Sequence, residues 1–312
     1  MGRVQEVSTL TFVADIKRLH IEPTTVCQAE CPMCIRTILG YHNGTMENKE
    51  LKFNQFKTLV SPLISNLTKV LFCGSLGDPI ACKDLRVMML WMLQKNPQLT
   101  IRINTNGAIG STDLWTNIAY LIKDNPASSV IFSLDGLEDT NHIYRKKVVW
   151  KKVMANAKAF IDAGGVAHWE MIVFKHNEHQ IDEAKQLAED MGFRAFRTKA
   201  TSRFDHNPNT GLEPPTIHSF EMKDKEFECH VERERSVYLS AEGLWYPCCW
   251  THVAHAYKDD QWGDPIVNII DRSTKWYNLE KNILSKSLDK VCHRACATTA
   301  FGGQSTTEQY FS

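Results

Sequence analysis

The sequence lacks a long apolar run. Residues 1–17 are mixed polar and include Asp15 and Lys17, so they contain no apolar core of the length that a secretory signal peptide needs. No later run approaches the roughly 20 apolar residues of a membrane-spanning helix. These two absences predict a cytosolic protein that does not bind a membrane.

The sequence also lacks a block of like charge, an internal repeat and a low-complexity tract. Its 36 basic and 36 acidic residues balance, which argues against a nucleic-acid-binding or anionic-membrane surface. The chain has 312 residues, 43% of them hydrophobic. It is therefore long enough for one large domain plus a small one, or for a single elaborated barrel.

Cysteine, by contrast, is present in ten copies, and clustered cysteines in a reducing compartment more often bind metal than form disulfides. Cys27, Cys31 and Cys34 form a C-x3-C-x2-C group after the apolar run Leu19–Ile21 and the break at Pro23. A structural zinc ion takes four ligands, and an electron-transfer iron–sulfur cluster takes four cysteines. Three thiols leave one coordination position open for chemistry. The alternatives to a reactive metal centre are three buried structural thiols or part of a zinc knuckle.

This spacing resembles the signature of the radical S-adenosylmethionine (SAM) superfamily. The resemblance implies that the three cysteines hold a [4Fe–4S] cluster whose fourth iron chelates the amino and carboxylate groups of SAM. It implies that the cluster, reduced by a donor of flavodoxin or ferredoxin type, cleaves SAM to a 5′-deoxyadenosyl radical, which abstracts hydrogen from a substrate. Met33 stands where the family usually has an aromatic residue, and its polarisable thioether can still pack on the adenine.

Between Lys17 and about Lys199, short β-branched runs alternate with longer amphipathic runs. The predicted strands are Arg18–Glu22, Lys69–Gly74, Leu99–Asn104, Ser128–Leu134, His168–Phe174 and Phe193–Lys199. The predicted helices are Lys49–Ser65 with Asn48 as N-cap, Leu85–Lys95, Thr112–Lys123, Trp150–Ala163 and Gln180–Met191. Strands separated by helices pair in parallel with right-handed crossovers. The predicted fold class is α/β, and six such units are the number in the partial (β/α)6 barrel of radical SAM enzymes, here over residues 1–200.

Polar motifs stand at the ends of three consecutive predicted strands, where the working residues of parallel α/β barrels lie. The segment 74–79, Gly-Ser-Leu-Gly-Asp-Pro, resembles the family's GGEP motif, with Leu76 and Asp78 replacing the first Gly and the Glu. Residues 104–107 contain the turn Thr-Asn-Gly, and residues 133–136 are similar to the family's S-x-D-G. Each is an ordinary turn when taken alone. The resemblance implies that the SAM-binding residues are Gly74, Gly77, Asp78, Asn104, Asn106, Ser133, Asp135 and Arg145.

Residues 201–228 are rich in Pro, Gly and Asn and predict a linker or substrate loop. Beyond them, Val237–Leu239 and Leu244–Tyr246 flank the turn 241–243, a pattern typical of a β-hairpin. The last residues, 301–312, are expected to form a loose tail or a lid.

A second cysteine set lies in this C-terminal region. Cys229 is followed by Gly243 and Cys248 in a spacing that resembles the opening of the SPASM/twitch extension. The resemblance implies a small twitch-like domain, a β-hairpin plus helix over residues 229–300, with one auxiliary [4Fe–4S] cluster bound by Cys229, Cys248, Cys292 and Cys296. Cys249 could replace Cys248 as ligand, and a structural four-cysteine zinc site is the rival interpretation.

These features predict an enzyme that abstracts hydrogen from a small molecule, as a dehydrogenase or an epimerase. An epimerase needs a hydrogen donor, and Cys249 and Cys73 are the candidates. A radical SAM peptide-modifying enzyme is the second hypothesis; fewer than twenty residues precede the first strand, which leaves no leader-binding domain. An iron–sulfur electron carrier or a zinc-stabilised binding module is the non-enzyme hypothesis.

Overall fold

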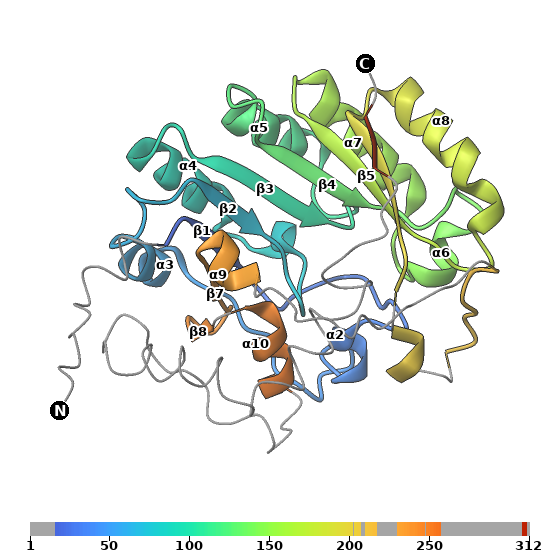
Figure 1. Cartoon of the computed structure of the whole chain (residues 1–312), viewed down its shortest axis with the longest axis horizontal. Helices are drawn as coiled ribbons and strands as arrows, with labels where there is room; N and C mark the ends of the chain where they lie inside the picture. The colour runs from blue at the N-terminus through green and yellow to red at the C-terminus, as the bar shows by residue number, and fades with distance from the viewer. Residues whose placement is uncertain are drawn as a thin grey trace, which may run out of the picture.

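The computed structural model describes residues 16–201, 203–206, 210–216, 230–246, 248–256 and 308–310. Over these residues the chain forms one sheet in the order β8-β7-β1-β2-β3-β4-β5-β6-β9 (Figure 1). The strands are β1 Arg18–Ile21, β2 Lys69–Phe72, β3 Thr100–Thr105, β4 Ser129–Ser133, β5 Ala167–Ile172, β6 Ala195–Lys199, β7 Ser236–Leu239, β8 Trp245–Tyr246 and β9 Glu308–Tyr310. Strands β1 to β6 pair in parallel in chain order, as the alternating pattern predicts.

Helices connect the parallel strands. The connecting helices are α3 Phe53–Val60, α4 Leu85–Lys95, α5 Thr112–Ile122, α7 Trp150–Asp162 and α8 Ile181–Met191. The other helical segments are α2 Ile35–Ile38, η1 Pro79–Ala81, α6 Asn141–Tyr144, η2 Glu178–Gln180, η3 Arg203–His206, α9 His230–Glu234 and α10 Cys249–Ala256. The predicted alternation of strand and helix is confirmed. Among the described residues, no helix is long and apolar enough to cross a membrane.

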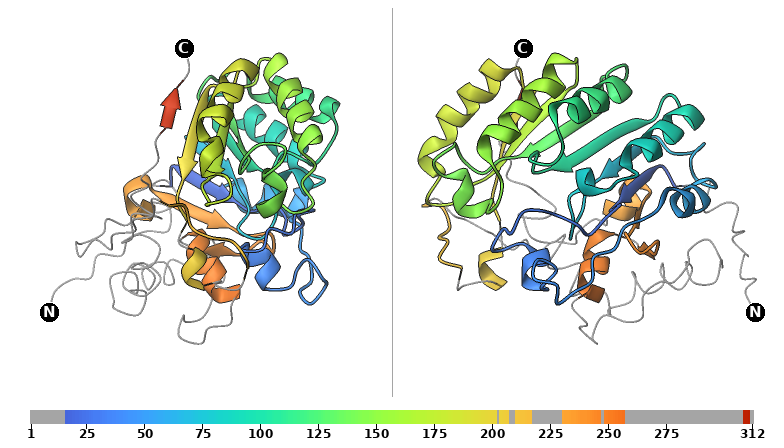
Figure 2. Two further views of the ribbon diagram at one scale, coloured as in Figure 1. Left: turned by 90° about the vertical axis from the view of Figure 1, so that its right-hand side faces the viewer. Right: turned by 180° about the vertical axis from the view of Figure 1, so that it is seen from behind.

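Side-chain alternation along the strands divides the sheet into two faces. Leu19, Val70, Ile101 and Val130 lie in the apolar core with residues of the connecting helices, which run along one side of the curved sheet (Figure 2). Neighbouring positions point to the opposite face because successive strand residues alternate. That face carries polar and charged residues, among them Arg102 of β3.

The first predicted helix was placed too early. Helix α3 begins at Phe53 with Lys52 as N-cap, not near Asn48. The preceding residues are held extended beside the cysteine loop, because Lys49 N–H donates to Thr25 Oγ1 at 2.7 Å and Thr25 N–H donates to the Lys49 carbonyl at 2.9 Å. Asn48 Oδ1 instead accepts a hydrogen bond from Arg36 at 2.9 Å.

The predicted C-terminal hairpin is confirmed as β7 and β8, which pair antiparallel around Gly243, a residue with a φ of +81°. Strand β7 also pairs in parallel with β1, in the register Arg18↔Ser236 to Ile21↔Leu239. The hairpin therefore continues the sheet of the predicted barrel. Part of the expected tail is also ordered in the sheet, since β9 pairs antiparallel with β6.

Candidate active site

The cysteine loop follows β1 and ends at α2. Cys34 N–H donates to the Cys31 carbonyl at 3.0 Å, which closes the turn between these two cysteines. The buried guanidinium of Arg36 donates to the Thr25 carbonyl and holds the start of the loop. The loop after β2 contacts it as well, through Asp78 N–H and the Val26 carbonyl at 2.9 Å. The three thiols are therefore presented at the carboxyl ends of the first strands.

Burial opposes ionisation of the thiols of Cys27 and Cys31. Burial raises the pKa of Cys27, chiefly by desolvation, and raises the pKa of Cys31 to about 11. The other two thiols add to the rise at Cys27, whereas the guanidinium groups of Arg145 and Arg203 oppose it at Cys31. All three cysteines are free thiols. Three thiols grouped in this way suit an electropositive metal centre that would hold them as thiolates.

The described residues hold no group of three or more His, Cys, Asp or Glu side chains that could bind a single metal ion. A [4Fe–4S] cluster has a different requirement, because each cysteine binds a different iron and the sulfurs need not converge on one point. Hydrogen bonds to the sulfur are a normal part of such a site. Here Ala29 N–H donates to Cys27 Sγ at 3.4 Å and Asn106 Nδ2 lies 3.6 Å from it. The donor set and its surroundings fit a cluster.

Asp78, expected to bind SAM, lies with its carboxylate turned to the loop after β3. Its oxygens accept from Thr105 Oγ1 at 2.9 Å, Asn106 N–H at 2.8 Å and Asn106 Nδ2 at 2.6 Å, and from Ile80 N–H at 3.0 Å. Burial raises the pKa of Asp78 and these hydrogen bonds oppose the rise. The carboxylate therefore orients Asn106, whose Oδ1 accepts from Gln28 of the cysteine loop at 2.6 Å.

The predicted pair Asp135 and Arg145 is brought together after β4. Asp135 Oδ2 accepts from Arg145 Nε at 2.5 Å, and Oδ1 accepts from Ile172 N–H at 2.6 Å. The guanidinium lies over the ring of Tyr144, with 5.4 Å from Cζ to the centroid. Arg203, which the sequence did not single out, donates to Tyr144 Oη at 2.6 Å. Two guanidinium groups thus act on Cys31 and make this corner suitable for a carboxylate.

Asn104 and Ser133 lie on the face of the sheet opposite the helices. The Oδ1 atom of Asn104 is buried with no hydrogen-bond partner in the described part of the chain. Ser133 ends β4 beside Glu170 of β5 in the strand register. The carboxylate of Glu170 is bound by Arg197 and, at 2.5 Å, by Lys199, whose charges hold its pKa low against the effect of burial.

Glycine is required at both predicted positions after β2. A Cβ on Gly74 would lie 2.0 Å from the Gly77 carbonyl oxygen, and a Cβ on Gly77 would lie 2.0 Å from the Thr24 carbonyl oxygen. Neither backbone oxygen can move away as a flexible side chain could. The loop thus packs directly on the segment that leads into the cysteine loop.

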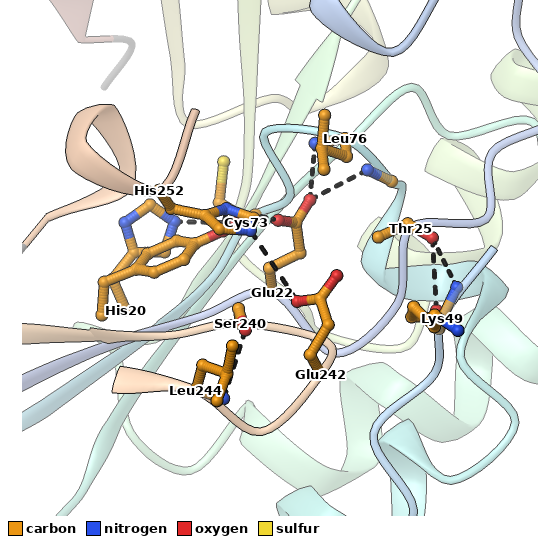
Figure 3. A network of polar contacts seen from close by, with 12 residues as sticks. His20, Glu22, Thr25, Lys49, Cys73, Leu76, Ser240, Glu242, Leu244 and His252 are labelled. Carbon is orange, nitrogen blue, oxygen red and sulfur yellow. Dashed lines mark hydrogen bonds and ion pairs between the residues drawn. The ribbon is translucent and has the colours of Figure 1, made fainter. Parts of the chain in front are cut away.

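Glu22 was missed by sequence reasoning, and Figure 3 shows it at the centre of a polar network. Its Oε1 accepts from the N–H groups of Leu76 at 2.5 Å and Gly77 at 3.0 Å, and its Oε2 accepts from Tyr238 Oη at 2.5 Å. His252 Nδ1 lies 3.1 Å from Tyr238 Oη and 3.5 Å from Glu22 Oε2. The sequence could have pointed to Glu22, because it stands at the end of a predicted strand. The sequence could not have shown its partners in β7 and α10, which lie far away along the chain.

The second cysteine set is described only in part. Cys248 precedes α10 and Cys249 begins it, whereas Cys229, Cys292 and Cys296 lie outside the described residues. Burial, with Cys248 and Cys73, raises the pKa of the Cys249 thiol well above its usual value. His252 of α10 lies 3.5 Å from Glu22, which accepts from Leu76 and Gly77, so α10 lies next to the loop after β2.

Solved structures with a similar fold bind SAM. The structure "anSMEcpe with bound AdoMet" has a TM-score of 0.57 and 14% identity, covering 86% of this chain and 79% of that one. SuiB of Streptococcus suis bound to S-adenosylmethionine has a TM-score of 0.53 and 15% identity, covering 80% and 66%. BtrN in complex with AdoMet and 2-DOIA has a TM-score of 0.50 and 15% identity, covering 92% and 95%. The chain therefore shares its fold with these SAM-bound proteins.

Sequence comparison agrees with this fold. No family model matches the chain. A similar curated protein is GTP 3′,8-cyclase of Campylobacter curvus (strain 525.92), 25% identical over 277 residues, which cover 77% of this chain and 82% of that protein. Fold and relative together support the radical SAM superfamily.

Proposed function

We propose that this chain is a radical SAM enzyme in which Cys27, Cys31 and Cys34 hold a [4Fe–4S] cluster. That cluster, with SAM bound, supplies a 5′-deoxyadenosyl radical that abstracts hydrogen from substrate. One observation carries the proposal: a loop with three free thiols follows the first strand of a parallel sheet, and the loops after β2 and β3 are hydrogen-bonded to it.

The chain's own residues would position the cofactor in distinct ways. Asn106 steadies the sulfur of Cys27, and Asp78 holds Asn106 in place. Arg145, fixed by Asp135, offers a positive charge beside Cys31 for the SAM carboxylate. Backbone and side-chain groups at Gly74, Gly77, Asn104 and Ser133 complete the proposed SAM-binding set.

The proposed reaction is dehydrogenation or epimerisation of a small molecule. BtrN, which was solved with 2-DOIA, supports a small substrate. The second candidate, a peptide-modifying enzyme, is supported by SuiB bound to the precursor peptide SuiA and by anSMEcpe with the Cp18Cys peptide. In an epimerase, the thiol of Cys249 would be the hydrogen-atom donor.

We further propose an auxiliary [4Fe–4S] cluster in a twitch-like region over residues 229–300, with residues 201–228 as linker. Its ligands would be Cys229, Cys248, Cys292 and Cys296. Electrons would reach the enzyme from a flavodoxin or ferredoxin. The proximity of α10 to the loop after β2 supports a location of Cys248, which precedes α10, near the proposed SAM site.

The test is SAM cleavage after anaerobic reconstitution. The native chain should release 5′-deoxyadenosine and methionine with dithionite, and replacing Cys27, Cys31 or Cys34 by Ala should abolish both products. Cys82→Ala is the matched control, because Cys82 is buried after β2 and outside the loop. Retained cleavage in any one of the three loop variants would refute the site.

A further inference from the structure

Strands β1 to β4 carry a group of polar residues on the face opposite the helices. Ile101 and Val130 are fully buried in the core on the helix side. Their neighbours Arg102 and Ser129 therefore point the other way. Arg102 and Ser129 are also Cα partners across β3 and β4, so the two side chains lie side by side on this face.

Both of these side chains hold a buried atom that lacks a hydrogen bond. Within the described part of the chain, Ser129 Oγ and Arg102 Nε have no hydrogen-bond partner. Ser129 is only 2% exposed. A buried polar atom without a hydrogen-bond partner destabilises the folded state, and native structures hold few of them. Arg102 Nε and Ser129 Oγ can both donate, so two such atoms on paired residues favour an acceptor group at this place.

The surrounding charge is positive. Arg18 and Lys69 are Cα partners on β1 and β2. On β3 the Cα partner of Lys69 is Thr100, and Arg102 lies two residues further along the same face. Burial and then the charges of Arg102 and Arg18 lower the pKa of Lys69 to about 8. Glu234 of α9 offsets part of this charge through its ion pair with Arg18 at 2.5 Å. Three cations on one face of neighbouring strands, with Arg102 diagonal to Lys69 and one carboxylate beside Arg18, would be stabilised by a bound anion.

We propose that Arg102, Ser129 and Lys69 form an anion-binding site on this face of the sheet. The ligand is a phosphate or carboxylate group: Arg102 would donate from its planar guanidinium, Ser129 from its hydroxyl and Lys69 from its ammonium. The evidence for this site is the pair of unpartnered atoms in Arg102 and Ser129. The neighbouring cations indicate that the ligand is negatively charged.

Use of this site by the substrate rests on the function proposed above. Arg102 precedes Asn106 by four residues, which is roughly 13 Å along an extended chain. A molecule that is held at Arg102 and reacts beside the cysteine loop is therefore extended as well as anionic. This favours a phosphorylated or carboxylated substrate larger than one sugar ring.

The experiment measures anion binding by calorimetry on the full, cluster-reconstituted chain without SAM. The probes are inorganic pyrophosphate, succinate and the neutral myo-inositol, at constant ionic strength so that screening does not differ. Pyrophosphate or succinate should bind and myo-inositol should not. The preferred anion identifies the ligand as a phosphate or a carboxylate. Arg102→Gln should weaken binding at least about tenfold, since a hydrogen bond to a charged group contributes about 1.5–3 kcal/mol.

Arg86→Gln, on the exposed side of α4, should bind like the native chain. Ser129→Ala is the second variant and should weaken binding severalfold without changing the charge. No anion binding, or equal binding by native and Arg102→Gln proteins, would overturn the site. Because the assay contains no SAM, anion binding without SAM cleavage would overturn the proposed function alone, and cleavage without anion binding would overturn this site alone.

Discussion

At the scale of single residues, three buried carboxylates connect neighbouring strand ends. Glu22 at the end of β1 accepts from the loop after β2, Asp78 in that loop accepts from the loop after β3, and Asp135 after β4 accepts from β5. All three are almost inaccessible to solvent, and burial raises the pKa of each. For each carboxylate, several hydrogen bonds offset the unfavourable desolvation, and the same hydrogen bonds fix the loops around the cysteines.

The pKa of Glu22 leads to a prediction of pH dependence. Burial, the largest cause, raises it from 4.5 to about 7, although Tyr238 and the backbone of Leu76 and Gly77 oppose the rise. Because this pKa is higher in the folded than in the unfolded state, the contribution of protonated Glu22 to the free energy of unfolding is complete below about pH 4.5. It is lost as the pH rises through about 7. Its full size is of the order of 3 kcal/mol.

Glu22→Gln keeps an uncharged acceptor at this position, so the Tm of the variant minus that of the native protein should increase from pH 5 to pH 8. Tyr238, His252 and Glu242 face Glu22 and are common to both proteins. Parallel thermal unfolding curves at a series of pH values measure this difference. A difference that stays flat or decreases would show that Glu22 is ionised throughout.

At the scale of elements, β7 decides how the C-terminal region relates to the barrel. The sequence places the hairpin in a separate small domain, yet β7 pairs along the whole of β1. Its Val237 and Leu239 lie in the same core cluster as Leu19. A strand that shares both hydrogen bonds and core with the barrel should unfold with it.

Val237→Ala tests this. Val237 is 1% exposed, so the substitution should cost about 1–3 kcal/mol and lower the single unfolding transition of the barrel by several degrees. Val87→Ala, which is 39% exposed on α4, should change the Tm little. Calorimetry distinguishes the outcomes: a second, smaller transition that alone shifts in Val237→Ala would mean that the hairpin folds independently.

At the scale of the whole molecule, the proposed function predicts that each chain binds two [4Fe–4S] clusters. Two [4Fe–4S] clusters require about eight iron and eight sulfide per chain. Cys248→Ala should lower both to about four while the cysteine loop keeps its own cluster. Iron and sulfide analysis of anaerobically reconstituted protein measures this, and about four of each in the native chain would remove the auxiliary cluster.

Local pattern alone determined the α/β alternation, the hairpin and the grouping of Cys27, Cys31 and Cys34. These depend on periodicity and spacing within a few residues, which any short stretch of sequence displays. Only the tertiary structure decided that β7 continues the sheet beside β1, that Glu22 meets Tyr238, and that Arg102 lies next to Ser129. Strand partners and buried polar contacts join residues far apart in the chain, and the packing of the whole molecule selects them; no local pattern encodes that choice.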